Sequence, residues 1–202
     1  SAITMKMWSE EKRMGTIEFL LTSSTEIWQV TLGKFLACIA LVAIAVLLTI
    51  SLPITIGLIT PLNWGPIVGG YVATLFLAAA YLAVGMFVSA RSESQVVSLI
   101  VSIIICGGFY LMGTDVLGTL VGSETLGLLK LLAPQTHFQS ISRGVIDIRD
   151  FYYYLSLGGA FLCLSSHQIR RLRWGTRTRT SQNTLVILII SNLFLGNVWL
   201  NY

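Results

Sequence analysis

Residues 30–59 read VTLGKFLACIALVAIAVLLTISLPITIGLI, an almost unbroken run of apolar side chains with one charge, Lys34. A helix needs roughly 20 predominantly apolar residues to cross the hydrocarbon core of a bilayer. The run therefore predicts a membrane-spanning helix, and the long side chain of Lys34 can carry its ammonium to the interface. Pro53 and Gly57 predict a kink toward the far end of this helix.

Further apolar runs follow along the chain and predict an all-α, polytopic bundle of transmembrane helices. A turn at 60–66 carries Trp64, a residue typical of the headgroup level. The next run is rich in glycine and alanine, which suits close helix packing but is also common in lipid-facing helices. Ser92 and Gln95 have capping-box spacing and predict a helix start near Val96. The remaining predicted spans are 67–88, 96–112, 151–169 and 184–202.

The composition excludes an ordinary soluble domain. The chain has 202 residues, of which 54% are hydrophobic and 11% are charged, whereas soluble domains carry about 25% charged residues. The net charge is +4, but the basic residues lie at the ends of apolar runs. This arrangement indicates membrane orientation and not binding of nucleic acid.

The distribution of basic residues predicts which ends of the spans face the cytoplasm. Lysine and arginine concentrate on the cytoplasmic side of membrane proteins. With residues 1–29 in the cytoplasm, ten of the 13 basic residues face inward: Lys6, Lys12, Arg13, Lys34, Arg91, Arg170, Arg171, Arg173, Arg177 and Arg179. Lys130, Arg143 and Arg149 then face outward. The mixed segment 113–150 is accordingly predicted to be a re-entrant or interfacial hairpin on the outer side, covered by protein.

No motif for catalysis or nucleotide binding occurs in the chain. There is no Gly-x-x-x-x-Gly-Lys-Ser/Thr loop and no His-Glu-x-x-His motif. The two histidines, His137 and His167, are predicted to lie on opposite sides of the membrane. Each cysteine is expected to be a small buried side chain: Cys38, Cys106 and Cys163. We therefore expect no catalytic, cofactor-binding or metal-binding residues, although a lipid-modifying enzyme using His137, Asp147 and Asp150 remains an alternative.

The most polar stretch of the first half, residues 6–29, predicts an interfacial or cytoplasmic amphipathic helix. Met14, Ile17 and Leu21 recur at helical spacing on one face, and Gly15 predicts a bend. Many charges accompany this apolar face, and they can form salt bridges with a partner.

Within this stretch, the segment Trp8-Ser-Glu-Glu-Lys-Arg-Met-Gly-Thr-Ile-Glu-Phe-Leu-Leu-Thr22, followed by Gly33-Lys34-Phe35, resembles the permease subunits of type-2 ABC exporters. In that family the corresponding segment is a coupling helix that touches the ATPase. The resemblance implies ATPase-coupling roles for Glu11, Arg13, Gly15, Thr16, Ile17, Glu18, Leu20, Leu21 and Thr22.

A second segment carries the same resemblance. Phe138-Gln-Ser-Ile-Ser-Arg-Gly-Val-Ile-Asp147 is similar to the outer segment that precedes the last permease helix of the family. The pattern is closest to the gliding-motility-associated permeases, with the permease of the nitrous-oxide-reductase maturation operon as the alternative. The resemblance covers residues 1–174 and implies an outer gate built from His137, Phe138, Arg143, Gly144 and Asp147.

The resemblance also implies the domain organisation. Residues 1–29 would be a cytoplasmic coupling segment and residues 30–174 the transmembrane permease domain. The family has two more helices upstream, and Ser1 to Met5 resembles the inner end of the second. Residues 175–202 would form a linker and an additional anchor helix, similar to that of an auxiliary membrane subunit.

Function and partners follow from the same resemblance. It implies a multi-pass permease of the bacterial inner membrane that exports a substrate using ATP hydrolysed by a separate ABC ATPase subunit. No cofactor would be bound by the permease itself. Expected partners are the ATPase, a second permease copy, membrane lipid and an auxiliary membrane subunit. The alternative is a non-transporting scaffold or anchor of a motility or secretion machine.

Overall fold

The computed structural model describes residues 2–16, 26–114, 133–144 and 147–174, together with 191, 195 and 196, and side chains only as far as Arg170 in the last helix. All regular structure in these residues is α-helical, which confirms the predicted fold class. The helices are α1 (Met5–Arg13), α3 (Ile27–Leu48), α4 (Ser51–Ile59), α5 (Trp64–Arg91), α6 (Gln95–Met112), α9 (Pro134–Ser142) and α10 (Ile148–Trp174).

Three helical stretches in the described residues are long and apolar enough to cross a membrane: Ile27–Ile59, Trp64–Arg91 and Gln95–Met112. They contain the first three predicted spans. The fourth, 151–169, lies within the 27-residue helix α10, and its crossing stays a prediction. The fifth, 184–202, lies outside the described residues except for three positions.

The first span bends where the sequence predicts a kink, although the break lies upstream of the proline. Thr49 and Ile50 form a turn between α3 and α4, four residues before Pro53. Proline has no N–H, and its ring clashes with the carbonyl group four residues earlier. Thr49 therefore turns its carbonyl to the N–H of Leu52, at 3.1 Å.

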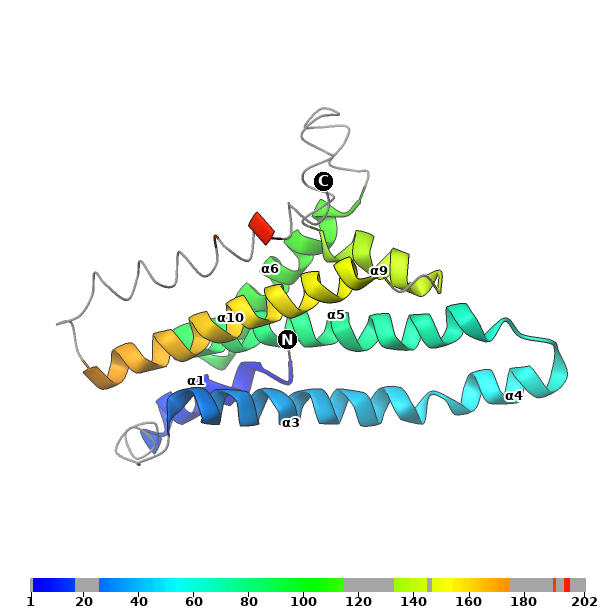
Figure 1. The fold of residues 1–202 in the computed structure, drawn as a ribbon. Coiled ribbons are helices and arrows are strands. Elements are labelled where there is room, and N and C mark those ends of the chain that lie inside the picture. Colours follow the sequence, from blue (N-terminus) through cyan, green and yellow to red (C-terminus); the bar gives the residue numbers. More distant parts are fainter. Residues whose placement is uncertain are drawn as a thin grey trace.

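Helix α5 is the centre of the molecule. Figure 1 shows α3 and α4 running along one side of α5, with α10 and α6 on the other. Helix α1 packs against α5, α3 and α6, and α9 packs against α5, α10 and α6. We call the end of the bundle at Ile27, Arg91 and α1 the α1 end, and the opposite end, at Trp64 and α9, the α9 end.

Small residues of α5 form close helix contacts, which confirms one of the two interpretations of its composition. Gly69, Ala73, Ala80, Ala83 and Gly85 are buried. A Cβ atom on Gly69 would overlap the carbonyl oxygen of Ile141 in α9, and one on Gly85 would overlap the Thr4 hydroxyl before α1. Both short helices therefore approach α5 where its surface lacks a side chain.

The predicted capping box at the start of α6 is wrong in its details. The N-cap residue is Ser94, not Ser92, and α6 begins at Gln95 with no side-chain cap bond. Ser92 instead donates its hydroxyl to the carbonyl of Ser94, at 2.9 Å. Serine hydroxyls bond to nearby backbone groups in turns as readily as at helix caps.

Candidate functional site

Helix α1 is fixed in the bundle by a fully buried tryptophan. Trp8 packs against Ile27 of α3, Ala90 of α5 and Ile169 of α10, and its exposed fraction is 0%. A buried tryptophan removes a large apolar surface from water. The α1 end is therefore built around Trp8, with three of the long helices in contact with it.

A serine of α5 bonds to the first turns of α1. Helix α1 begins at Met5, and the backbone N–H groups of its fourth and fifth residues, Trp8 and Ser9, donate to Oγ of Ser89, at 3.1 and 3.2 Å. The Ser89 hydroxyl donates in turn to the carbonyl of Met5, at 3.1 Å. One buried side chain of α5 thus bonds to three backbone groups of α1.

A second polar contact joins α1 to the C-terminal end of α5. The Lys12 ammonium donates to the carbonyl oxygen of Ala90, in the last turn of α5. Cations are favoured there because the helix dipole places partial negative charge on the last carbonyl groups. Partial burial lowers the pKa of Lys12 below its ordinary value, and the nearby carboxylate of Glu93 opposes this shift.

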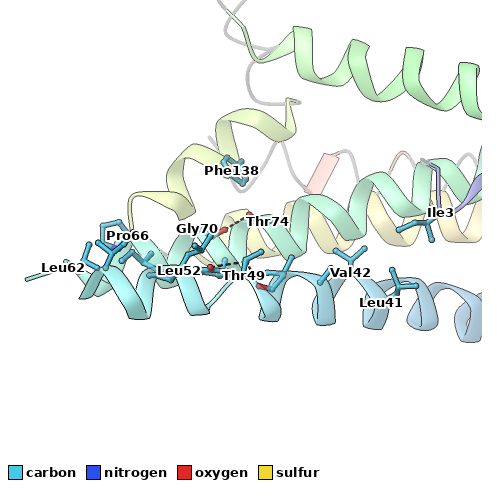
Figure 2. Close-up of a pocket in the computed structure, with 16 residues that line it drawn as sticks. Ile3, Leu41, Val42, Thr49, Leu52, Leu62, Pro66, Gly70, Thr74 and Phe138 are labelled. Carbon is cyan, nitrogen blue, oxygen red and sulfur yellow. Dashed lines mark hydrogen bonds between the residues drawn. The ribbon is translucent and has the colours of Figure 1, made fainter. Parts of the chain in front are cut away.

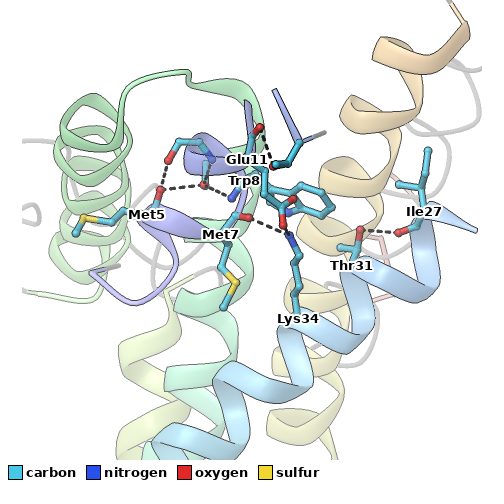
Figure 3. A network of polar contacts seen from close by, with 10 residues as sticks. Met5, Met7, Trp8, Glu11, Ile27, Thr31 and Lys34 are labelled. Atoms are coloured by element: carbon cyan, nitrogen blue, oxygen red, sulfur yellow. Dashed lines mark hydrogen bonds and ion pairs between the residues drawn. The ribbon is translucent and has the colours of Figure 1, made fainter. Parts of the chain in front are cut away.

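Lys34 of α3 contacts α1 from the side away from Ser89 and the end of α5 (Figure 3). Its ammonium lies 2.5 Å from Oε1 of Glu11, donates to the Met7 carbonyl at 3.0 Å, and sits 4.0 Å from the centroid of the Trp8 ring. The Lys34 ammonium, which the sequence placed at the membrane interface, is thus bound by side-chain and backbone groups of α1. Both side chains of the ion pair are partly buried, with exposed fractions of 18% for Lys34 and 27% for Glu11.

The predicted coupling residues divide into inward-facing and exposed positions. Glu11 faces α3 through Lys34, whereas Arg13, Gly15 and Thr16 are exposed. Gly15 has a φ of +71° in the turn after α1, a conformation that favours glycine, which confirms the predicted bend. The other predicted coupling residues lie outside the described residues: Ile17, Glu18, Leu20, Leu21 and Thr22.

At the α9 end a buried histidine–aspartate pair fastens α9 to α10. Nδ1 of His137 lies 2.6 Å from Oδ1 of Asp150, and both residues are buried. The His137 ring stacks on the ring of Tyr153, with 4.1 Å between centroids. Next to it, the hydroxyl of Tyr154 donates to the carbonyl of Pro134, at 2.7 Å. Helix α9 is thereby attached to the first turns of α10 by two polar contacts and one aromatic contact.

The same short helix lies directly on the start of α5. Ile141 approaches Gly69, and Gly144 lies against the backbone of Gly65, with a φ of +85°. Phe138 packs on a buried cluster that includes Ala73 of α5. The α9 end therefore joins α5, α9 and α10 through glycines and aromatic rings.

The structure separates the predicted outer-gate residues into two groups. His137 and Phe138 lie in the contact between α9 and its neighbours, whereas Arg143, Gly144 and Asp147 are exposed, although Gly144 also lies against the backbone of Gly65. The carboxylate of Asp147 accepts the backbone N–H of Arg149 at 3.2 Å.

The residues named for the lipid-modifying enzyme are likewise divided. His137 and Asp150 are adjacent and buried, whereas Asp147 is exposed. The pairing of His137 with Asp150 could not be predicted from the sequence, because the two residues are 13 positions apart in different helices.

A long apolar groove runs between α3–α4 and α5 (Figure 2). Its volume is about 860 Å³, and it extends from Ile3 and Leu41 to Leu62 and Pro66, with Phe138 of α9 above it. The lining is almost entirely apolar, as expected for a surface covered by hydrocarbon. Its polar groups include Thr49, whose hydroxyl donates to the Tyr71 hydroxyl at 3.2 Å.

The cysteines differ in burial from one another, so the prediction that all three are buried is wrong. Cys38 is buried, Cys106 is half-buried and Cys163 is exposed. The apolar surroundings of Cys163 in the sequence indicated burial, but on a membrane helix an apolar neighbour is often lipid-facing. Exposure in a membrane protein therefore follows helix packing and not local hydrophobicity.

Together these features define a helical membrane protein with a short amphipathic helix anchored at one end of its spans. The family model for ABC-2 family transporter proteins matches residues 1–200. The chain belongs to this family and is a membrane-spanning permease subunit of an ABC transporter, and membership of the family implies association with an ABC ATPase subunit. No curated protein and no solved structure matches the chain.

Proposed function

We propose that this chain is the permease of an ABC exporter and that α1, with the residues that follow it, is the contact for a separate ATPase subunit. The anchoring of α1 carries this proposal. One short helix touches α3, α5, α6 and α10 at a single end of the bundle. A force applied to α1 therefore acts on every long helix of the described structure.

The exposed side of this segment is the surface we assign to the ATPase. Arg13, Met14, Gly15 and Thr16 are exposed at the end of α1, and Met14 has an exposed fraction of 62%. We also assign to the ATPase contact the coupling residues that the sequence predicts after Thr16: Ile17, Glu18, Leu20, Leu21 and Thr22. Glu11 has a different role, because its carboxylate is held by Lys34 within the chain.

The α9 end is the proposed outer gate. Helix α9 lies across the start of α5 and α10, so its displacement would open this end of the bundle. Two permease copies would pair and move the substrate along their interface. An exposed apolar stripe on α6 supports a contact with a second copy or with lipid: Val97, Ile100, Ile104 and Leu111.

We also propose that the protein lies in the bacterial inner membrane, with the α1 end in the cytoplasm. The basic residues support this orientation, since Lys6, Lys12, Arg13, Lys34 and Arg91 all belong to the α1 end. The Arg143-Gly-Val-Ile-Asp147 pattern supports kinship with the gliding-motility permeases. The apolar run after residue 184 supports an auxiliary membrane partner.

Purification of the protein from its native membrane in mild detergent, followed by an ATPase assay, tests the proposal. We expect an ATPase subunit to co-purify, and we expect R13E combined with E18K to abolish or strongly reduce its stimulation. R149E, which reverses an exposed charge at the α9 end, is the matched control and should leave stimulation unchanged. Absence of any ATPase would favour a membrane scaffold instead.

A further inference from the structure

We infer that Lys34 of α3 is the positioning residue that passes movement of α1 to the first membrane span, while Ser89 keeps α1 seated on α5. This inference rests on the proposed role of α1 in ATPase coupling. It names two residues of the membrane spans, one in α3 and one in α5, that would connect α1 to those spans.

The contact of α1 with α5 has the character of a rigid joint. Ser89 is fully buried and makes three hydrogen bonds with the backbone of α1. The Thr4 side chain lies directly against the backbone of Gly85, in the space that a side chain at position 85 would occupy. Lys12 adds a fourth polar contact, at the carbonyl of Ala90. Because these hydrogen bonds between Ser89 and the α1 backbone are shielded from water, α1 and the end of α5 are expected to move together.

The contact of α3 with the bundle is narrow and lies near the α1 end. The buried residues of α3 are Ile27, Thr31 and Cys38, and α4 has none. With Lys34 they follow spacings of four, three and four residues, which place them on one face of the helix. Among the three candidate spans, Ile27–Ile59 is the least buried. Lys34 is the charged member of the only buried stripe that α3 presents within the described residues.

Beyond this stripe the apolar groove lies between α5 and the helices α3 and α4, from Leu41 and Val42 to Ile56. Contacts along the groove include the bond from the Thr49 hydroxyl to the Tyr71 hydroxyl, at 3.2 Å, and the approach of Gly57 to the ring of Trp64. The break at Thr49 and Ile50 divides the helix there. A small rotation of α3 about the stripe is therefore expected to shift α4 relative to α10.

Lys34 is suited to transmit such a rotation because one ammonium makes three contacts with α1. It bonds to the carboxylate of Glu11 and to the carbonyl of Met7, and it lies over the ring of Trp8. The pair is partly exposed, with fractions of 18% and 27%, so water can replace either partner while the contact reforms. Movement of α1 relative to α3 is expected to act through this polar contact, beside the packing of Trp8 on Ile27.

The test uses the permease–ATPase complex reconstituted in lipid nanodiscs, with magnesium ATP as the nucleotide. The variant K34M/E11M removes both charges together, so that neither charge is left without its partner. We expect the complex to assemble with an unchanged melting temperature. Stimulation of the ATPase is expected to fall about fivefold or more, the lower range of allosteric coupling. K34R, which retains the charge and the donors, should keep stimulation close to wild type.

A second measurement separates coupling from a merely structural role. Spin labels at Leu58 of α4 and Ile148 of α10, both exposed, report the distance between α4 and α10. The native cysteines are replaced by alanine for this purpose. In the wild type this distance is expected to change when ATP is trapped with vanadate. K34M/E11M should abolish the change while K34R preserves it.

The outcomes distinguish the two proposals. If the wild-type protein binds no ATPase, the proposed function itself fails. If R13E uncouples the complex but K34M/E11M keeps both stimulation and the distance change, the role of Lys34 is overturned and the proposed function stands. Should the double variant not reach the membrane, E11Q takes its place: reduced stimulation in E11Q supports the inference, and unchanged stimulation overturns it.

Discussion

The imidazole of His137 and the carboxylate of Asp150 face each other across the contact between α9 and α10, with Nδ1 and Oδ1 2.6 Å apart. Both residues are nearly excluded from water, with exposed fractions of 6% and 5%. A buried acceptor loses its bonds to water and must be compensated by the protein. The pair therefore requires that α9 stay in its present position.

Loss of one member of this pair should loosen the α9 end. H137A leaves the Asp150 carboxylate buried without its partner, and breaking a buried pair in this way costs about 3–5 kcal/mol. We expect a clearly lower melting temperature in detergent and easier proteolysis around α9. H137F/D150L, which removes both polar groups and keeps a ring against Tyr153, should lose much less.

An exposed carboxylate at the same end provides the control for this measurement. Asp147 lies only three residues from Asp150, but its side chain is about half exposed. D147N should therefore change the free energy of unfolding by no more than about 0.5 kcal/mol. If H137A were as stable as D147N, the pair would not be what holds α9 in place.

The sequence predicted the first three spans well because their signal is local. Apolar runs of sufficient length are visible without any knowledge of packing, and the break before Pro53 follows from the chemistry of a single residue. The bend at Gly15 was predicted for the same reason. Each of these features depends on residues close together in the chain.

The contacts between helices could not be predicted in the same way. Ser89 bonds to the backbone of a helix about 80 positions earlier in the chain, and nothing near Ser89 in the sequence marks it for that role. Lys34 did carry a signal, as the lone charge of its run, but its partner Glu11 did not. Hydrophobic periodicity specifies which residues favour burial and leaves open which helix covers them.

Replacement of Ser89 by alanine should weaken the attachment of α1 to α5. The variant S89A leaves the N–H groups of Trp8 and Ser9 without their acceptor, and leaving a buried donor unsatisfied costs about 1–3 kcal/mol. We expect a lower melting temperature and faster protease cleavage between α1 and α3. S92A should be almost silent, since the Ser92 hydroxyl bonds within the turn before α6. Equal effects of the two variants would contradict the role of Ser89 in holding α1.

A methyl group on Gly85 should displace α1 more severely. In G85A the new Cβ would overlap the Thr4 hydroxyl, so the segment before α1 would have to move. We expect reduced thermal stability and weaker co-purification of the ATPase. G70A is the matched control, because no atom lies within 4 Å of its new Cβ and alanine favours a helix by about 1 kcal/mol over glycine. A G85A protein that behaves like G70A would show that Thr4 does not fix the approach of α1.

The lowered pKa of Lys12 predicts how stability depends on pH. Burial lowers the pKa of this ammonium in the folded protein below its ordinary value of 10.5, so the unfolded chain binds the proton more tightly. Stability should accordingly rise as the pH increases from the lowered pKa toward 10.5, and this gain should vanish again as the pH falls below the lowered value. The melting temperature measured from pH 8 to 11 should show this contribution in the wild type. In K12M it should be absent, while K6M, at an exposed position of α1, should retain it. Parallel curves for wild type and K12M would mean that the contact of Lys12 with α5 does not bury its ammonium.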